Sequence, residues 1–173
     1  MDLVLPEKVN RTGFTGHRRM TPEERLAAGE ALAEIIPLLA ARGAGTFVCG
    51  GALGFDTAAE LAVLRAKSRG IAVRLELVLP CPDQDRLWQD PDRAVYAEIK
   101  KLADSVSVVC PEYRRGCMHM RDRELVRGCD LLIAWLHPEE TRGGTLYTVK
   151  QAERAGIPVI NLMKATGMVY ERQ

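Results

Sequence analysis

The sequence predicts an α/β fold with one doubly wound, mostly parallel, Rossmann-like sheet and helices on both faces. Short apolar runs with the length of buried strands alternate along the chain with longer segments of helical periodicity. Such alternation is typical of parallel sheets, because a crossover helix connects each strand to the next. The chain has 173 residues, of which 47% are hydrophobic, so we expect a single domain that spans residues 1–173.

Six apolar runs bounded by polar or glycine-rich residues are expected to form the strands. In chain order they are residues 9–15, 45–49, 72–80, 105–110, 130–136 and 157–162. Five helices are expected between them, over residues 21–43, 56–69, 91–103, 120–129 and 144–156.

The first helix has the clearest start signal. Thr21 can cap it, Pro22 suits the first helical position, and Glu24 completes a capping box. Pro37 lies inside this helix and is expected to kink it. For the helix over residues 91–103, Asp90 is the expected cap.

Charge and cysteine content limit the classes of function. The formal net charge is +1, so no global basic field indicates nucleic acid or a membrane surface. No apolar run approaches the roughly 20 residues of a membrane span, and the first residues lack the layout of a signal peptide, so we expect a cytoplasmic protein without membrane contact. The five cysteines are odd in number and none has CxxC spacing, which indicates reduced thiols. Cys117 and His119 supply at most half of a metal site and no matching half is visible, so no metal is expected.

Three loops at expected strand ends carry the candidate binding residues. In a parallel sheet the carboxyl ends of the strands meet at one edge, where ligands bind near the topological switch point. GHRR follows the first strand, GGALGFD follows the second, and TRGGT follows the fifth. The candidate ligand-binding residues in these loops are Gly16, His17, Arg18, Gly50, Gly51, Gly54, Asp56, Gly143, Gly144 and Thr145.

Each glycine-rich loop precedes a helix, an arrangement typical of anion-binding turns. Glycine permits positive φ and lets backbone N–H groups approach a ligand, and the helix adds the positive end of its dipole. The first loop does not have the GxGxxG spacing of the dinucleotide fingerprint. Each loop is also compatible with a tight turn that binds nothing, with Thr145 as a plain N-cap. Two such loops at one edge of the sheet favour a shared site.

Asp56 is the unusual residue of the first loop, because a carboxylate repels phosphate. It can cap the helix that follows, a role worth about 1 kcal/mol. Thr57 with Glu60 is a competing capping box in the next register, which would leave Asp56 free to face a ligand. In that position Asp56 suits a ribose hydroxyl or a base N–H.

Arginines are concentrated in or just after the strand-end loops. Each alone is compatible with solvated surface, but together they predict a local positive rim that suits an anionic ligand. Trp88 and Tyr113, in loops at the same edge, can stack on a base or cover the core. The six arginines of this expected rim are Arg18, Arg19, Arg114, Arg115, Arg121 and Arg142.

Several of these segments together resemble the YpsA-like proteins of the SLOG superfamily of Rossmann-like domains. The resemblance rests on TGHR after the first strand, GGALGFDTAAELA, the polar loop with Gln84 and Trp88, and GGTLYTVKQAERAGIPVINL. It covers essentially the whole chain and implies binding of a nucleotide or a nucleotide-derived ligand. By analogy with the family we also expect a homo-oligomer. No cofactor is expected to be required.

Two better-known branches of the superfamily are similar to parts of the chain. GGALGFDTAAELAVL and GGTLYTVKQAERAGIPV resemble the core of DprA, which binds single-stranded DNA. MHMRDRELVRGCDLLIAW resembles the stretch of LOG-type phosphoribohydrolases that carries a catalytic arginine, which falls here on Arg121. LOG enzymes then carry PGGxGTxxE with a catalytic glutamate, whereas this chain has RGGTLYT and places Thr148 at the glutamate position.

Three hypotheses of function follow. The first is a binding protein with the role of a sensor, which holds a nucleotide-type ligand between the two glycine-rich loops. The second is a hydrolase of nucleotide N-glycosidic bonds, with Arg121 positioning phosphate and Asp56 or Glu60 acting on the ribose, against which Thr148 argues. The third is DprA-like binding of single-stranded nucleic acid, which the 5% aromatic content and the balanced charge make less favoured.

Overall fold

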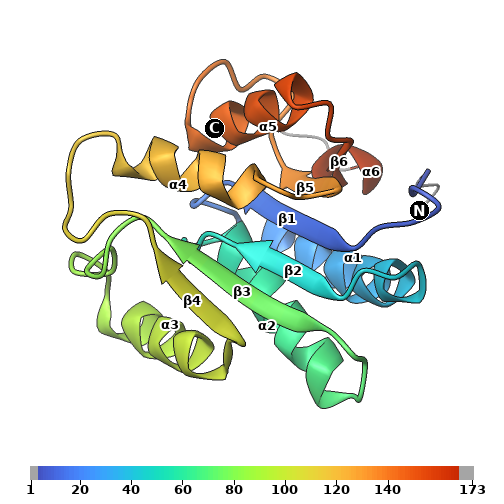
Figure 1. Cartoon of the computed structure of the whole chain (residues 1–173), viewed down its shortest axis with the longest axis horizontal. Coiled ribbons are helices and arrows are strands. Elements are labelled where there is room, and N and C mark those ends of the chain that lie inside the picture. The colour runs from blue at the N-terminus through green and yellow to red at the C-terminus, as the bar shows by residue number, and fades with distance from the viewer. Residues whose placement is uncertain (1–3, 168–173) are drawn as a thin grey trace.

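A computed structural model describes residues 4–167 of the chain; residues 1–3 and 168–173 of the expected domain lie outside the described residues. The described chain forms one six-stranded sheet, and every pair of neighbouring strands is parallel. Helices lie on both faces of this sheet (Figure 1). The predicted doubly wound, Rossmann-like α/β fold is therefore confirmed, with a sheet that is wholly parallel.

The order of the strands across the sheet is β4-β3-β2-β1-β5-β6. The chain first moves outward from β1 to β4 at one edge, then returns past β1 to β5 and ends at β6. The switch point therefore lies between β1 and β5, whose register pairs Phe14 with Ile133. The strands are β1 (Arg11–Gly16), β2 (Thr46–Cys49), β3 (Arg74–Leu79), β4 (Ser105–Val108), β5 (Leu131–Trp135) and β6 (Val159–Asn161).

Two groups of helices cover the two faces of the sheet. The larger hydrophobic cluster includes buried residues of α1, α2, α3 and α6, and the smaller one includes residues of α4 and α5. The helices are α1 (Pro22–Ala41), α2 (Phe55–Ser68), α3 (Asp90–Leu102), α4 (Cys117–Val126), α5 (Gly144–Arg154) and α6 (Leu162–Ala165).

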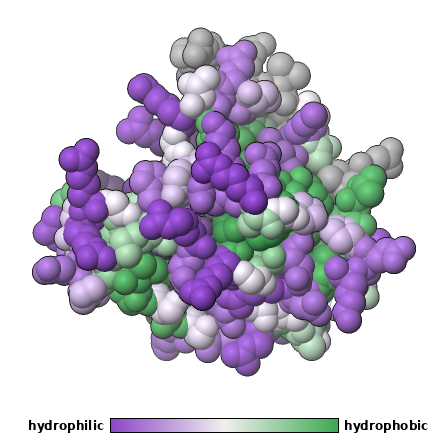
Figure 2. All heavy atoms as spheres, turned by 45° about the horizontal axis from the view of Figure 1, so that its top comes forward, coloured by the Kyte–Doolittle hydropathy of each residue, from purple (hydrophilic) through white to green (hydrophobic). Residues whose placement is uncertain are grey.

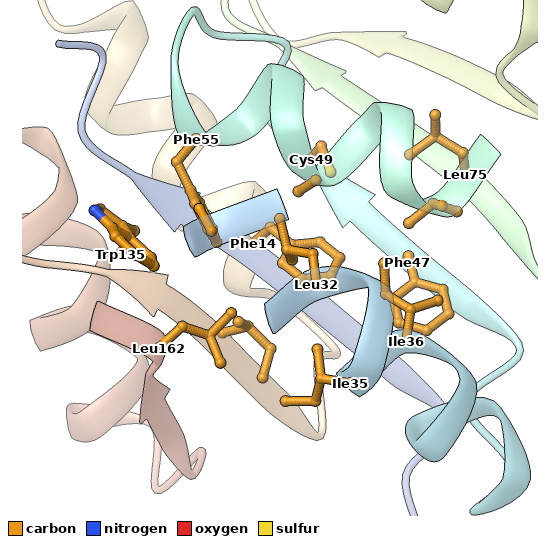
Figure 3. Close-up of a cluster of buried hydrophobic side chains, with 14 of the residues drawn as sticks. Phe14, Leu32, Ile35, Ile36, Phe47, Cys49, Phe55, Leu75, Trp135 and Leu162 are labelled. Atoms are coloured by element: carbon orange, nitrogen blue, oxygen red, sulfur yellow. The ribbon is translucent and has the colours of Figure 1, made fainter. Parts of the chain in front are cut away.

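Aromatic rings fill the centre of the larger cluster. Phe14 of β1 stacks on Phe47 of β2 with ring centroids 5.8 Å apart, and Phe55 of α2 stacks on Trp135 of β5 at 6.0 Å. Figure 3 shows these side chains pointing toward one another together with Leu32 and its neighbours in α1. Phe55, the first residue of α2, is thereby packed against Trp135 at the carboxyl end of β5.

The predicted start of α1 is confirmed. The Thr21 hydroxyl accepts the Glu24 amide at 3.1 Å, and the Glu24 carboxylate accepts the Thr21 amide at 2.7 Å. These bonds pair two of the donors that a helix start leaves open. The helix continues through Pro37 to Ala41 without interruption.

Two local expectations need correction, and one short helix was not expected. Asp90 is the first residue of α3 and not its cap, because Gln89 occupies the N-cap position without a side-chain bond. Helix α4 starts three residues earlier than expected, because Gly116 turns the chain with φ +88° just before Cys117. The four-residue α6 was not expected, since it is too short to show helical periodicity.

Within residues 4–167, no helix combines the length and the apolar character that crossing a bilayer requires. On the face shown in Figure 2, hydrophilic side chains predominate and hydrophobic residues gather in a few patches between them. All five cysteines are buried and form no disulfide.

Candidate functional site

A polar pocket opens where β1 ends, at the switch point of the sheet. Its volume is about 190 Å³. Both glycine-rich loops reach it, so the expectation that they lie at one edge of the sheet is confirmed. It is lined by Phe14, Thr15, Gly16, His17, Arg18, Ala52, Asp56, Arg121, Asp122, Leu125, Gly144 and Thr145.

The second glycine-rich loop is open to the pocket. Gly143 has φ +117°, and a side-chain carbon at Gly144 would meet only the Asp122 carboxylate, 3.9 Å away. Within residues 4–167, the amide N–H groups of Gly144, Thr145 and Leu146 have no acceptor. These free donors and the positive end of the α5 dipole make this loop suitable for an anion.

The first glycine-rich loop is instead packed against other parts of the protein. A side-chain carbon at Gly50 would collide with the Arg121 guanidinium, and one at Gly54 would lie 2.3 Å from the His17 carbonyl oxygen. A carbon at Gly16 would overlap the Phe55 side chain. These glycines therefore allow close contacts within the protein, and their predicted contact with a ligand stays a prediction.

Gly51 joins the loop to the long polar segment after β3. Its N–H donates to the Glu60 carboxylate at 3.0 Å, and its carbonyl accepts a hydrogen bond from the Gln84 side-chain amide (Nε2) at 2.9 Å. The same Gln84 amide donates to the Tyr96 hydroxyl at 2.7 Å, and the Tyr96 ring lies 5.0 Å from that of Trp88. Of the two expected stacking residues, Trp88 is half-buried and packs against the core, whereas Tyr113 is 63% exposed.

Arg121 is the centre of a buried polar network. Its Nη1 donates to the Gly50 carbonyl at 2.5 Å, and its Nε donates to Asp122 Oδ1 at 2.8 Å. Asp56 Oδ2 lies 3.8 Å from the same Nη1. One guanidinium thus holds α4, the first glycine-rich loop and α2 together, with a carboxylate on either side.

Asp56 closes the turn before its own helix. Gly54 occupies the N-cap of α2, and Asp56 Oδ2 accepts the Ala52 amide at 3.2 Å. The predicted capping box of Thr57 and Glu60 is wrong. The Thr57 hydroxyl donates to the Ala52 carbonyl at 3.0 Å, and Glu60 accepts the Gly51 N–H of the loop. Asp56 nevertheless lines the pocket, as the alternative with a ligand-facing carboxylate requires.

Burial controls the protonation of the acids in this network. Desolvation raises the pKa of both Asp56 and Asp122, although the Arg121 charge opposes the shift in each case. Burial, with the nearby Asp56 carboxylate, holds the pKa of Glu60 well above its usual range. Glu60 accepts a hydrogen bond from the Gly51 N–H and does not line the pocket. Of the two acids, Asp56 is therefore the candidate for contact with a ligand in this pocket.

The raised pKa of Glu60 predicts how stability depends on pH. Between its ordinary value of 4.5 and the higher folded value, Glu60 keeps its proton only in the folded state, so the free energy of unfolding falls as pH rises through this window. Glu60→Gln cannot ionise and should lack this part of the fall, whereas the exposed control Glu98→Gln should behave like wild type. Urea unfolding over about pH 4 to 9 measures it. Parallel pH profiles of wild type and Glu60→Gln would contradict the assignment.

His17 is engaged at the side of the pocket. Its Nε2 accepts the His137 amide at 3.0 Å, and the His137 ring bonds to Glu24 at 2.8 Å. Burial, followed by the neighbouring His137, lowers the pKa of His17. Because Nε2 accepts a hydrogen bond, Nδ1 is the ring nitrogen that can donate an N–H at the pocket wall.

Thr145 and Thr148 have different surroundings from those the sequence suggested. Gly143 occupies the N-cap of α5, so Thr145 is not the cap but the second helical residue. Thr148, at the LOG glutamate position, donates its hydroxyl to the Gly144 carbonyl at 2.8 Å. Its hydroxyl is thus bonded within α5, and Thr148 does not line the pocket.

The six predicted rim arginines separate into two groups. Arg121 and Arg18 line the pocket, and of these two Arg121 is buried and Arg18 is exposed. The other four are exposed and do not line the pocket. Among residues 4–167, no group of three or more His, Cys, Asp or Glu side chains is arranged to hold a metal ion.

Sequence reasoning missed Asp122 and Thr15. Asp122 follows Arg121 directly, and that adjacency of opposite charges was the only available signal. Thr15 precedes the GHRR loop at the end of β1, where an inward-facing polar side chain in a buried strand is uncommon. Both side chains are buried and line the pocket.

The fold and the pocket define a class of protein: a Rossmann-like α/β protein with a polar pocket at the switch point of its sheet. A family model described as the YspA SLOG family matches residues 27–158. The chain belongs to this family, as the resemblance of its motifs to YpsA-like proteins implied.

Two solved structures share the fold of this chain. DNA processing protein A from Helicobacter pylori, studied for its single-stranded DNA binding mode, matches with a TM-score of 0.62 and 21% identity, over 87% of this chain and 63% of that one. The X-ray structure of TM1055, a structural genomics target, matches with a TM-score of 0.55 and 17% identity, over 87% and 72% of the two chains. This chain thus spans less than two thirds of the DNA processing protein A chain. A comparison with curated proteins gave no match.

Proposed function

We propose that the protein binds a nucleotide or a nucleotide-derived ligand in the pocket at the switch point, and that it acts as a sensor and not as an enzyme. The observation that carries this proposal is the open start of α5, whose first three N–H groups have no acceptor among residues 4–167, beside buried polar side chains in the same pocket. Membership of the SLOG family and the fold shared with DNA processing protein A support a nucleotide-related ligand.

The phosphate of the ligand belongs at Gly144 and Thr145 in this proposal. Their N–H groups have no acceptor in the described part of the chain, and the helix dipole favours negative charge there. Arg18, exposed at the pocket wall, adds a positive charge on the solvent side. Asp56 lies on the opposite loop, where it accepts a hydrogen bond from an uncharged part of the ligand and does not meet the phosphate.

Asp56→Asn should weaken nucleotide binding by roughly 1–3 kcal/mol, because a charged hydrogen bond becomes a neutral one. The asparagine oxygen can still accept the Ala52 amide, so the melting temperature should change little. Calorimetric titration with AMP, GMP, CMP and UMP, beside thermal unfolding, measures both quantities. The surface variant Asp92→Asn is the control. If Asp56→Asn melts earlier and keeps wild-type affinity, Asp56 only closes the turn.

We expect no appreciable release of free base from nucleoside monophosphates. Cleavage of the N-glycosidic bond develops positive charge on the ribose, which a nearby carboxylate must stabilise. Thr148 stands where LOG enzymes carry that carboxylate, and its hydroxyl is bonded to Gly144. Chromatography for adenine, guanine or cytosine after hours at high protein concentration is the assay. Steady turnover that Asp56→Asn or Arg121→Ala abolishes would establish an enzyme.

Binding of single-stranded nucleic acid is the second candidate. DNA processing protein A, with the same fold, supports it, and so does the exposed loop that carries Tyr113, Arg114 and Arg115 beside the carboxyl edge of the sheet. A ring and two guanidinium groups on one loop suit stacking and phosphate contact.

One experiment separates the two candidates. The purified protein is heat-denatured and the supernatant is analysed by mass spectrometry, while the native protein is titrated with oligonucleotides at several salt concentrations. A released nucleotide supports the pocket proposal. A supernatant without any nucleotide, together with oligonucleotide binding that weakens steeply with salt, favours the second candidate.

A further inference from the structure

We propose that the pocket selects ribonucleotides over deoxyribonucleotides, with Asp56 and Asp122 together reading the hydroxyls of the ribose; this rests on the proposed nucleotide binding. Asp122 was not among the site residues predicted from the sequence, and it is the specificity residue of this proposal. Each of these carboxylates has an oxygen in the pocket that residues 4–167 leave without a hydrogen bond.

Four buried polar side chains line the pocket with an atom that has no hydrogen-bond partner within residues 4–167. Asp56 uses Oδ2 for the Ala52 amide and leaves Oδ1 free. Asp122 uses Oδ1 for Arg121, and its Oδ2 is no closer than 3.8 Å to the His119 ring nitrogen. The exposed fractions of these side chains are small: Thr15 7%, Asp56 4%, Asp122 5% and Thr145 8%.

The two free carboxylate oxygens require donors from the ligand. A ligand that fills this pocket takes both oxygens out of water, and a buried polar group without a partner is costly, so the ligand should supply at least two hydrogen-bond donors. Arg121 lies between the carboxylates and holds both in place, which fixes the direction of their free oxygens. Two acids around this one buried cation disfavour an anion at this point, and the Arg121 charge disfavours a metal ion.

The neighbouring phosphate loop identifies the donors as sugar hydroxyls. The Asp122 carboxylate lies 3.9 Å from the position of a side-chain carbon at Gly144, so it adjoins the loop proposed for the phosphate. In a nucleoside 5′-phosphate the group next to the phosphate is the sugar, and the base lies beyond it. The pocket volume of about 190 Å³ is below the roughly 300 Å³ at which pockets begin to enclose drug-sized ligands, which fits a sugar inside and a base at the rim.

The 2′-hydroxyl should therefore contribute strongly to binding. A site built to bond a hydroxyl rejects the analogue that lacks it, because its own buried groups are then left without partners. We expect each 2′-deoxynucleotide to bind about tenfold more weakly than its ribonucleotide, or weaker still. Asp122→Asn should narrow this ratio, since a neutral amide discriminates less than a carboxylate.

The test is calorimetric titration of the intact protein with AMP, GMP, CMP and UMP and with the 2′-deoxy form of each. The expected result is a clear ribonucleotide preference in wild type that shrinks to within about threefold in Asp122→Asn and persists in the surface control Asp92→Asn. Equal binding of the two series by wild type would overturn the inference and leave the proposed function standing. A preference that neither Asp56→Asn nor Asp122→Asn reduces would also overturn it. Failure of every nucleotide to bind would overturn the proposed function and the inference together.

Discussion

Replacing Gly144 with valine should abolish nucleotide binding and leave the protein folded. A branched side chain at this position would project over the N–H groups of the first turn of α5, which the proposed phosphate needs to approach. The fold should tolerate the change, because Gly144 does not have positive φ and the nearest atom to an added side-chain carbon is 3.9 Å away. We expect a loss of affinity of about a hundredfold or more, which corresponds to ~2.7 kcal/mol.

Gly45→Val is the matched control for this variant. Gly45 precedes β2 at the other edge of the sheet, has no atom within 4 Å of an added side-chain carbon and does not have positive φ. Calorimetric titration with the four ribonucleoside monophosphates and thermal unfolding of both variants give the comparison. Unchanged affinity of Gly144→Val for every nucleotide that wild type binds would rule out the phosphate loop.

Arg121→Ala should destabilise the protein by about 3–5 kcal/mol, because removing one member of a buried ionic network leaves its partners uncompensated. Asp122 would lose its bonded donor, Asp56 would lose its nearest positive charge, and the Gly50 carbonyl would lose a hydrogen bond. Urea unfolding at neutral pH measures the change in the free energy of unfolding.

Arg115→Ala is the control for the loss of a positive charge. Arg115 is exposed in the loop before α4, so its removal should change stability by less than about 0.5 kcal/mol. If Arg121→Ala is no less stable than Arg115→Ala, the network is not what holds α4 against the first glycine-rich loop.

Much of the fold could be predicted from the sequence because each strand and each long helix has a local signal. The capping box of Thr21 and Glu24 marks the start of α1, and the apolar run of β5 is unambiguous. Boundaries that depend on one residue were harder. In α3, Pro91 takes the second helical position and not the first, so the cap moved from Asp90 to Gln89.

The candidate site could be placed at the correct edge, but its internal contacts could not. A glycine in a sequence shows that something approaches the backbone closely, without showing what. At Gly50 and Gly54 that neighbour is the protein itself, whereas at Gly144 the space is open. Likewise, the place of Asp122 in the pocket depends on how α4 packs beside α5, which no local pattern records.

The most direct test of the central claim is an amide chemical-shift titration of the isotopically labelled protein with AMP, GMP, CMP and UMP in turn. If the pocket binds the phosphate and sugar of a nucleotide, the largest shifts should fall on the amides of Gly144, Thr145 and Leu146, with Ala52 affected through Asp56. A second groove lies between α1 and α2 and is lined by Leu32, Ala62 and their neighbours. Saturating shifts confined to that groove, or confined to residues 111–116, would contradict the account. The absence of shifts with all four nucleotides would contradict it as well.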